Sequence, residues 1–289
     1  MSSPQPWTPS PAAVERARYR AGQRRRSFWI ALASTLIVIA VAVVILVTSP
    51  GWDRTRTAFF DPQVAALVFP SVLQGLWLNL RVWLLAGLVS LAAGLALAVL
   101  RTSSAPVLFP VRAAIAVYVD VFRGLPLLLV LLLAGFGLPA LRLAWLPVDG
   151  VFLGSLAIVL TYTAYTTEIF RAGIEAVSPA QVQAARALGL TRAQATRAVV
   201  VPQAVRNVTP VLLNTVVSLQ KDSGLISILG AVDAIRAAEI AVTGAYNFTP
   251  YVVASALFLL ISIPLTRAVD AYGAKHGWGA SRPAAGVWR

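Results

Sequence analysis

Long apolar segments constrain this chain more than any other feature of its sequence. Residues 28–47 form a run of 20 residues without a charge, which at 1.5 Å per helical residue is the length needed to cross the hydrocarbon core of a bilayer. Further segments of similar character lie at 76–100, 113–136, 151–170, 208–230 and 251–269. The sequence therefore predicts an all-α membrane protein with about six transmembrane helices.

The composition indicates a chain surrounded by lipid rather than by water. Hydrophobic residues make up 58% of the 289 residues and charged residues 12%, whereas a soluble domain is about a quarter charged. The net charge of +13 would favour nucleic-acid binding in a soluble chain, but here the basic residues lie between apolar segments. The absence of cysteine excludes disulfides and thiolate sites, and the single histidine, His276, is interpreted as solvated.

Six crossings would place the connecting segments alternately on the two sides of the membrane, and basic residues are distributed unevenly between these sides. Of the 24 Lys and Arg residues, 17 lie in segments on the side of the N-terminus, four lie in segments on the opposite side, and three lie within the spans. Because positively charged loops stay in the cytoplasm, we expect both termini to be cytoplasmic in a multi-pass protein of the plasma (inner) membrane. Residues 25–28 are faintly similar to a twin-arginine signal, but no small-x-small cleavage site follows the long apolar run.

Residues 171–207 form the longest connection on the predicted cytoplasmic side, and local signals indicate a helical hairpin. The segments Ser178–Gln181 and Thr191–Gln194 each fit a capping box, in which two side chains satisfy backbone N–H groups at the start of a helix. Gly189 fits the left-handed residue that ends the first helix, and Pro202 is expected to break or redirect the chain. The expected result is a rigid knob of two short helices.

This hairpin carries a motif that resembles the EAA loop of binding-protein-dependent ABC permeases. Gln183-Ala184-Ala185 is followed after three residues by Gly189, and after nine more by Val-x-Val-Pro at 199–202. Gln183 stands where the family has Glu and so lacks the charge that an ion pair at that position needs, while the two valines replace Ile and Leu conservatively. The resemblance implies that ATP-binding subunits contact this loop through Gln183, Ala184, Ala185, Gly189, Leu190, Val199, Val201 and Pro202.

Three other segments are similar to the polar amino-acid branch of the same family. They are VFRGLPLL at 121–128, EIFRAGI at 168–174 and LQKDSGL at 219–225. The similarity covers roughly residues 74–272 and implies a five-helix permease core with one extra N-terminal helix. The expected domains are a disordered cytoplasmic tail (1–27), the extra helix (28–48), a permease domain (70–272) that includes the coupling loop 171–207, and a cytoplasmic tail (273–289).

The resemblance implies the transmembrane permease subunit of an ATP-driven importer for polar amino acids, rather than an enzyme. No G-x-x-x-x-G-K-[ST] phosphate loop is present, so ATP and Mg²⁺ are expected in separate ATP-binding subunits, with no cofactor, metal or catalytic residue in this chain. The other expected partners are an extracellular amino-acid-binding protein, a second permease chain that is identical or paralogous, the amino-acid substrate and the lipid bilayer, without nucleic acid.

Two other functions compete with this interpretation. An ion-gradient-driven secondary amino-acid transporter would place related intramembrane sites in two repeats, and the sequence shows no such repeat. A non-transporting membrane scaffold would not need several charged residues within its spans, because such charges are costly in a bilayer. Copurification with stoichiometric ATP-binding subunits would distinguish the importer from both.

Charged residues within the predicted spans are candidates for the substrate path or for a gate. Asp120 and Arg123 are three residues apart and can pair with each other, and Glu168 can meet Arg171 in the same way. Arg81 is interpreted as reaching the membrane interface with its long side chain. Structural pairing is the competing interpretation for each of these residues.

The adjacent residues Lys221 and Asp222 interrupt an apolar helix that resembles the pore-lining segment of the family. Neighbours in a helix point about 100° apart and cannot face each other, so each needs a partner elsewhere in the bundle or a watery cavity. A zwitterionic amino acid offers both a carboxylate and an ammonium. Lys221 and Asp222 are therefore candidates for the substrate path, with structural pairing between helices as the alternative.

The charge distribution predicts a topology that labelling can check. Single cysteines introduced at Ser3 and Thr57 should react with an impermeant thiol reagent from opposite sides of the membrane, because the first apolar run separates a basic segment from an external one. The native chain has no cysteine, so labelling has no background. Labelling of both positions from one side would contradict six crossings.

Overall fold

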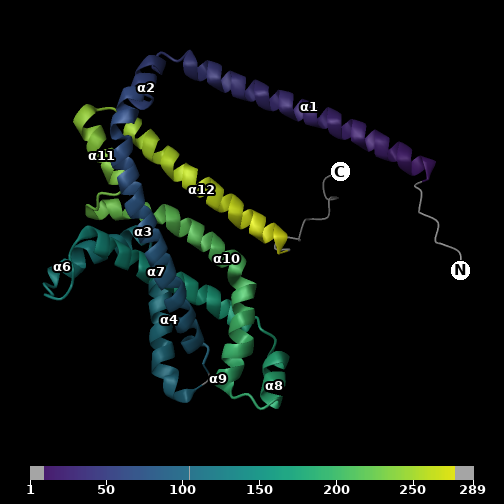
Figure 1. The fold of residues 1–289 in the computed structure, drawn as a ribbon, viewed down its shortest axis with the longest axis vertical. Helices are drawn as coiled ribbons and strands as arrows, with labels where there is room; N and C mark the ends of the chain where they lie inside the picture. Colours follow the sequence, from purple (N-terminus) through teal and green to yellow (C-terminus); the bar gives the residue numbers. More distant parts are fainter. Residues whose placement is uncertain (1–9, 104, 277–289) are drawn as a thin grey trace. The chain divides into compact units, whose positions relative to one another are not determined.

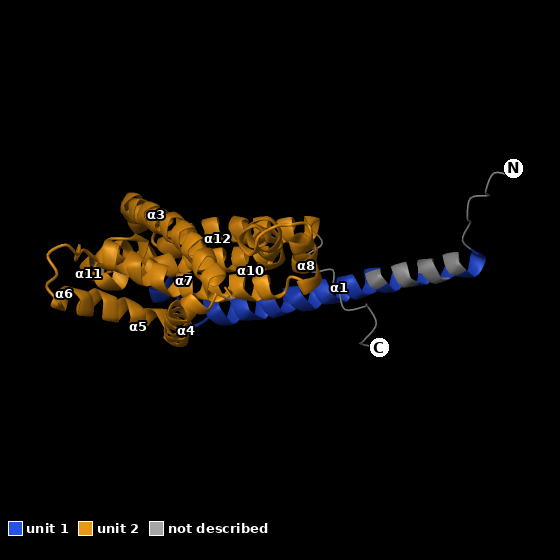
Figure 2. Cartoon of the chain, turned by 90° about the horizontal axis from the view of Figure 1, so that it is seen from below, with its two compact units in different colours: residues 1–57 blue, residues 58–289 orange. Residues whose placement is uncertain are grey.

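The computed structural model describes residues 10–103 and 105–276, and all regular elements in these ranges are helical (Figure 1). Two compact units, residues 1–57 and 58–289, are described separately (Figure 2). The elements are α1 (Pro11–Val47), α2 (Trp52–Phe59), α3 (Pro62–Arg101), η1 (Pro106–Leu108), α4 (Phe109–Gly124), α5 (Leu127–Leu132), η2 (Leu133–Gly137), α6 (Leu138–Ala140), α7 (Gly150–Glu175), α8 (Pro179–Ala187), α9 (Arg192–Ala195), η3 (Thr196–Val200), α10 (Val201–Asp222), η4 (Ser223–Leu229), α11 (Ala234–Ala245) and α12 (Thr249–Lys275).

The first unit consists mainly of α1, a single helix of 37 residues. Its apolar segment Arg25–Val47 is long enough to cross a membrane, and none of it is buried. The helix begins at Pro11, so the prediction of a disordered tail at 1–27 is wrong for residues 11–27, where Ala, Arg and Glu are good helix formers that extend an existing helix. Residues 1–9, like residues 277–289 of the predicted C-terminal tail, lie outside the described residues.

Within residues 10–103 and 105–276, four helices are long and apolar enough to cross a membrane, in α1, α3, α7 and α12, and a bent pair raises the number to five. The bent pair is the predicted single span 113–136, which instead turns by 109° between α4 and α5–α6. Pro126 causes the turn, because proline lacks an N–H and pushes the preceding residue out of the helical region. Leu125 accordingly has φ −93° and ψ 137°.

The predicted span 208–230 is not one α-helix either. α10 ends at Asp222, η4 continues as a 3₁₀-helix, and Gly230 ends it with φ 82°. α10 is long enough for a span but not apolar enough, because polar side chains such as Asn207 and Asn214 recur along it. By length and composition, four or five of the six predicted spans are therefore present in the described residues.

The second unit is built on close contact between α3 and α7. Gly94 of α3 lies so near α7 that an added Cβ would come within 2.8 Å of the Thr166 Cβ. The Thr166 hydroxyl donates a hydrogen bond to the Ser90 backbone oxygen at 2.8 Å. Farther along the same pair of helices, buried Ala98 and Phe170 share a hydrophobic cluster. The small residue Gly94 thus allows the two backbones to approach closely. The Thr166 hydroxyl has a hydrogen-bond partner at the same contact.

A buried amide joins α3 to the segment before α11. The Asn79 side chain, 1% exposed, donates to the Ser223 backbone oxygen at 3.0 Å and to the Asp233 carboxylate at 2.9 Å. Its oxygen accepts from the Ala234 N–H at 3.1 Å. Because a buried polar group without partners is costly, this network fixes how α3, η4 and α11 meet.

The α3–α7 contact predicts that a glycine-to-valine substitution has a larger effect on stability at Gly94 than at Gly87 of α3. Gly94→Val should lower the thermal unfolding midpoint of the detergent-purified chain, since overpacking a close contact costs about 1–3 kcal/mol. Gly87→Val is the matched control, because nothing lies within 4 Å of a Cβ added there. Equal midpoints for the two variants would show that the Gly94 contact is not required.

Candidate functional site

The α8–α9 hairpin, defined as residues 178–202, forms a helix–turn–helix unit at the junction of α7 and α10. Gly189 has φ +87°, which confirms the predicted left-handed turn. The capping box at the start of α9 is also confirmed, with Gln194 N–H donating to Thr191 Oγ1 at 3.3 Å and Thr191 N–H donating to Gln194 Oε1 at 2.8 Å. The box predicted at α8 is wrong, because the Ser178 side chain makes no capping hydrogen bond.

Pro202 does not break the chain as predicted. The π-helical turn η3 leads directly into α10, which begins at Val201. A π turn changes the backbone pairing from i,i+4 to i,i+5, and proline is tolerated in the first turn of a helix, where its missing N–H has no partner to lose. The motif residues at 199–202 therefore join the hairpin to α10 without a flexible link.

The motif residues divide between the surface and the interior of the hairpin. Gln183, Ala184 and Gly189 are exposed, whereas Ala185 is buried and its carbonyl oxygen accepts from the Leu190 N–H at 3.3 Å. The remaining motif residues Leu190, Val199 and Val201 are half-buried and Pro202 is exposed. Gln183, Ala184, Gly189 and Pro202 are therefore available to a partner, while Ala185 supports the hairpin itself.

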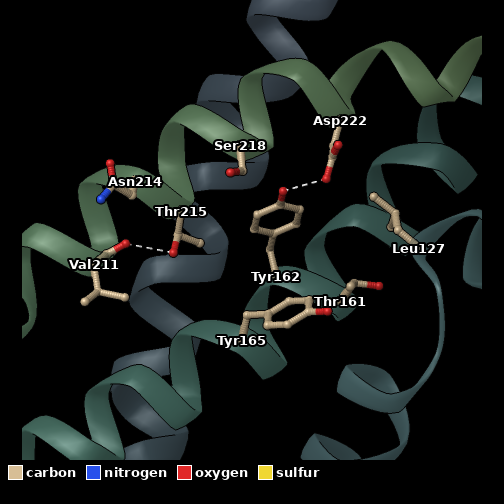
Figure 3. Close-up of a pocket in the computed structure, with 9 residues that line it drawn as sticks. All are labelled: Leu127, Thr161, Tyr162, Tyr165, Val211, Asn214, Thr215, Ser218 and Asp222. Atoms are coloured by element: carbon tan, nitrogen blue, oxygen red, sulfur yellow. Dashed lines mark hydrogen bonds between the residues drawn. The ribbon is translucent and has the colours of Figure 1, made fainter. Parts of the chain in front are cut away.

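A polar pocket lies between α7 and α10 (Figure 3). It has a volume of about 420 Å³, and α10 presents one stripe of side chains to it while α7 presents another. Its lining residues are Leu127, Thr161, Tyr162, Tyr165, Val211, Asn214, Thr215, Ser218 and Asp222. The spacing of Asn214, Ser218 and Asp222, each four residues apart, places them on one face of α10.

Asp222 supplies the charge of this pocket, and Tyr162 orients it. The Tyr162 hydroxyl donates to the Asp222 carboxylate at 2.7 Å (Figure 3), and the Tyr162 side chain is 5% exposed. Thr161, which also lines the pocket, has a buried hydroxyl without a hydrogen-bond partner among the described residues. Asp222 is the one charged residue among the described lining residues, so the pocket favours a ligand group that is cationic and donates hydrogen bonds.

The side chains of Lys221 and Asp222 point in different directions, as those of adjacent residues in a helix do. The Lys221 side chain is exposed and does not line the pocket, and it makes no ion pair within the described part of the chain. Asp222 therefore belongs to the pocket, and Lys221 does not. Arg81 is exposed on α3, with its guanidinium 5.9 Å from the centre of the Trp77 ring, as in a cation–π contact.

Glu168 lies at the centre of an ion cluster near the hairpin end of α7. Its carboxylate accepts from Arg101 at 2.9 Å and from Arg171 at 2.5 and 3.0 Å, and Arg123 approaches it to 3.9 Å. The predicted pairing of Glu168 with Arg171 is confirmed. The predicted pairing of Arg123 with Asp120 is wrong: Asp120 is exposed on α4 and forms no ion pair in the described ranges.

Sequence reasoning missed the α7 side of the pocket and the contribution of α3 to the ion cluster. A signal for the former exists, because residues 161–167 read TYTAYTT and concentrate hydroxyl groups within an apolar helix. Arg101 had no such signal, since it is 67 residues from Glu168 in the chain. No group of three or more potential metal ligands occurs in the described residues.

Apolar helices that border an open pocket with a carboxylate, together with an exposed hairpin, fit a helical membrane transport protein. Comparison with known proteins gives the family. Residues 90–275 match the family described as the binding-protein-dependent transport system inner membrane component. The chain belongs to this family. It is therefore a transport component rather than an enzyme. The match gives no support to the alternative of a secondary amino-acid transporter driven by an ion gradient.

Two relatives and two solved structures illustrate the similarity. The arginine transport system permease protein ArtQ of Bacillus subtilis (strain 168) is 31% identical over 68% of this chain and 88% of its own length. The probable glutamine ABC transporter permease protein GlnM of the same organism is 33% identical over 65% and 86%. A crystal structure of an amino acid ABC transporter with histidines has a TM-score of 0.62 and 33% identity, and covers 71% of this chain and 94% of its own. The MetNI methionine ABC transporter shares the fold, with a TM-score of 0.57 and 18% identity over 70% and 94%.

The pocket predicts unequal effects for two charge-removing substitutions. Asp222→Asn should lower uptake by the reconstituted system by at least about tenfold at low substrate, because a hydrogen bond to a charged group contributes about 1.5–3 kcal/mol. Asp120→Asn removes the same charge from an exposed position on α4 and should transport normally. Wild-type uptake by Asp222→Asn, with normal protein recovery, would exclude Asp222 from the path.

Proposed function

We propose that this chain is the permease subunit of an ATP-driven ABC importer for polar amino acids, forming the translocation path and coupling it to ATP-binding subunits. The proposal is based on one observation: the same two helices, α7 and α10, connect the hairpin to the pocket. The exposed motif of the α8–α9 hairpin lies at one end of α7 and α10, and the polar pocket lies between the same two helices. Relatives named for arginine and glutamine transport support the amino-acid assignment.

The chemistry of the pocket suits an amino acid. Its volume of about 420 Å³ lies in the range of about 300–1,000 Å³ that small-molecule sites occupy. Asp222 can accept hydrogen bonds from an ammonium group, while Asn214 and Ser218 offer donors to a carboxylate or a polar side chain. The Tyr165 ring adds an aromatic wall that can contact a cation or an aliphatic side chain.

The proposal includes a topology and a domain organisation. Six crossings result if α4 with α5–α6 counts as one bent span and α10 with η4 as another, in addition to α1, α3, α7 and α12. Both termini and the α8–α9 hairpin are then cytoplasmic, in agreement with the excess of basic residues there. Residues 28–48 form the extra helix, 70–272 the permease domain and 171–207 its coupling loop, with terminal segments 1–27 and 273–289 in the cytoplasm.

The partners follow from the same proposal. Two ATP-binding subunits would bind ATP and Mg²⁺ and grip the hairpins of two permease chains, which are identical or paralogous. An extracellular binding protein would deliver the amino acid. This chain would hold no cofactor of its own, and its contribution would be the path and the mechanical coupling, with Glu168, Arg123 and Asp222 in the path or its gate.

Packing offers a route for coupling between the hairpin and the pocket. Buried Val177, Val200 and Ala204 form one cluster that joins the end of α7, the turn η3 and the start of α10. Close by, a Cβ added to Gly173 would meet the Val208 side chain at 2.5 Å. Because packed interfaces shift as units, a force applied to the hairpin would move the hairpin ends of α7 and α10 together.

Reconstitution tests the proposed function. The chain, its ATP-binding subunits and the binding protein would be placed in liposomes and supplied with a panel of labelled amino acids. We expect uptake that requires ATP and the binding protein and that selects polar amino acids. Uptake driven by an ion gradient without ATP, or no stoichiometric copurification of ATP-binding subunits, would contradict the proposal.

The hairpin geometry predicts a loss of coupling from two substitutions. Gly189→Val should reduce ATPase docking and uptake, because a non-glycine residue in the left-handed region costs about 1–2 kcal/mol and a β-branched one is still less tolerated. Ala184→Trp should do the same by placing a bulky ring on the exposed face. Copurification of the ATP-binding subunits and stimulation of ATP hydrolysis by loaded binding protein provide the measurements.

Conservative variants at the same positions control for these effects. Gly189→Asn should retain coupling, since Asn tolerates a positive φ, and Ala184→Ser should retain it because the side chain stays small. Ala185→Trp would disturb the hairpin itself, because Ala185 is buried, and is less informative about docking. Normal docking and stimulated turnover in both Gly189→Val and Ala184→Trp would mean that the hairpin is not the coupling element.

A further inference from the structure

The ion cluster around Glu168 has two kinds of basic partner. Arg101 of α3 and Arg171 of α7 itself make direct hydrogen bonds to the carboxylate, at 2.9 Å and at 2.5 and 3.0 Å. Arg123, at the end of α4, stays 3.9 Å away. One carboxylate is therefore held firmly by two guanidinium groups and approached loosely by a third.

The two firm partners belong to one rigid frame. α3 and α7 are in close contact at Gly94 and Thr166, and buried Ala98 and Phe170 pack in a common cluster near the ion pair. Arg101 is the last residue of α3, and its side chain is 20% exposed. Arg101 and Glu168 are therefore attached to the same pair of closely packed helices.

The loose partner lies on an elbow, defined as residues 123–127. Arg123 is the second-last residue of α4, just before the break to α5, where Leu125 is extended and Pro126 follows. The two arms of the elbow differ in direction by 109°. Arg123 is 41% exposed, and four residues later Leu127 lines the pocket. The elbow thus connects the ion cluster to the wall of the pocket.

The cluster also lies on the face of α7 that lines the pocket. Thr161, Tyr165 and Glu168 occupy positions i, i+4 and i+7, which share one face of a helix. Glu168 is about 4.5 Å farther along the axis than Tyr165, at 1.5 Å per residue, and lies toward the hairpin. Along this face of α7, the ion cluster therefore lies between the pocket and the hairpin.

We propose that the cluster is the hairpin-side gate of the pocket, in which Arg101 is a positioning residue that fixes Glu168 and Arg123 is the movable member. Displacement of Leu127 by a solute turns the elbow, and Arg123 closes on Glu168 or withdraws from it. This inference rests on the proposed function, since a gate has meaning only in a chain that carries a solute. It adds a residue, Arg101, and a moving element, the elbow.

The geometry favours a gate over a purely structural staple. A staple would be expected to hold all three helices with short, buried contacts, as Arg101 holds α3 to α7. The Arg123–Glu168 contact is longer and half-exposed, and such pairs are weak, so it can open without disrupting the bundle. α4 is attached to α7 independently, through the Tyr118 hydroxyl, which donates to the Leu160 backbone oxygen at 2.5 Å.

Leakage measures the gate separately from folding. The full transport complex would be reconstituted in liposomes loaded with a labelled amino acid that the wild type imports, and efflux would be followed without ATP. We expect Arg123→Gln and Arg101→Gln each to raise ATP-independent efflux several-fold while membrane insertion and recovery of the ATP-binding subunits remain normal. Arg101→Lys, which keeps the positive charge, should return efflux toward the wild-type rate.

Arg112→Gln is the matched control for the loss of a positive charge. Arg112 lies on the same helix as Arg123 but donates to the Ser103 backbone oxygen and not to the cluster, so efflux should not change. Wild-type efflux in both Arg123→Gln and Arg101→Gln would overturn the gate. So would a lower thermal unfolding midpoint in Arg101→Gln combined with wild-type efflux in Arg123→Gln, because this pattern indicates a staple.

Failure of the proposed function gives a different result. In that case the wild-type complex itself would show no ATP-driven uptake of any labelled amino acid, and the gate would fall with it. If wild-type uptake is normal and the variants do not leak, the gate alone is wrong. The two outcomes are therefore distinguishable in the same set of liposomes.

Discussion

The contact between α3 and α7 is the constraint on which the rest of the second unit depends. Gly94 lets the two backbones approach until Thr166 donates to the Ser90 carbonyl. Such a hydrogen bond contributes about 0.6 kcal/mol on average in a membrane protein, so its energy is secondary to the packing that small residues permit. Because this contact sets the rotation of α7, it also determines which residues face α10 and which reach Arg101.

Polar side chains within this apolar bundle lie where neighbouring segments supply hydrogen-bond partners. Asn79 bridges α3, η4 and α11 through three hydrogen bonds, and Asp222 is paired with Tyr162 inside the pocket. Both are placed by helices that meet at fixed angles, since an unsatisfied polar group is costly in a low-dielectric environment. Thr161 is the contrasting case, because its buried hydroxyl has no hydrogen-bond partner among the described residues.

Helix irregularities divide the bundle into parts that can move separately. The α4–α5 break at Pro126 and the end of α10 at Asp222 both border the pocket, and the π turn η3 joins the hairpin to α10. Such breaks cost backbone hydrogen bonds and are common at functional sites. Their positions suit a transport protein whose path opens and closes while the α3–α7 frame stays intact.

The sequence by itself determined the membrane class, the family and the hairpin. Length of apolar runs, basic residues between them and the spacing of motif residues around Gly189 are local properties, and they do not depend on the rest of the fold. It also indicated that Asp222 and Glu168 needed partners, because charges within apolar helices are costly. It misplaced the partner of Arg123, since an i,i+3 spacing shows that Asp120 can pair but not that another carboxylate lies nearer.

Only the tertiary structure decided which charges share a site. Tyr162 and Asp222 are 60 residues apart, and Arg101 and Glu168 are 67 apart, so no local pattern predicts that they meet. The bend at Pro126 likewise acquires its meaning only when Leu127 is found in the pocket wall and Arg123 beside Glu168. The physical reason is that helix periodicity determines the face of a residue, whereas the packing of one helix on another determines what that face contacts.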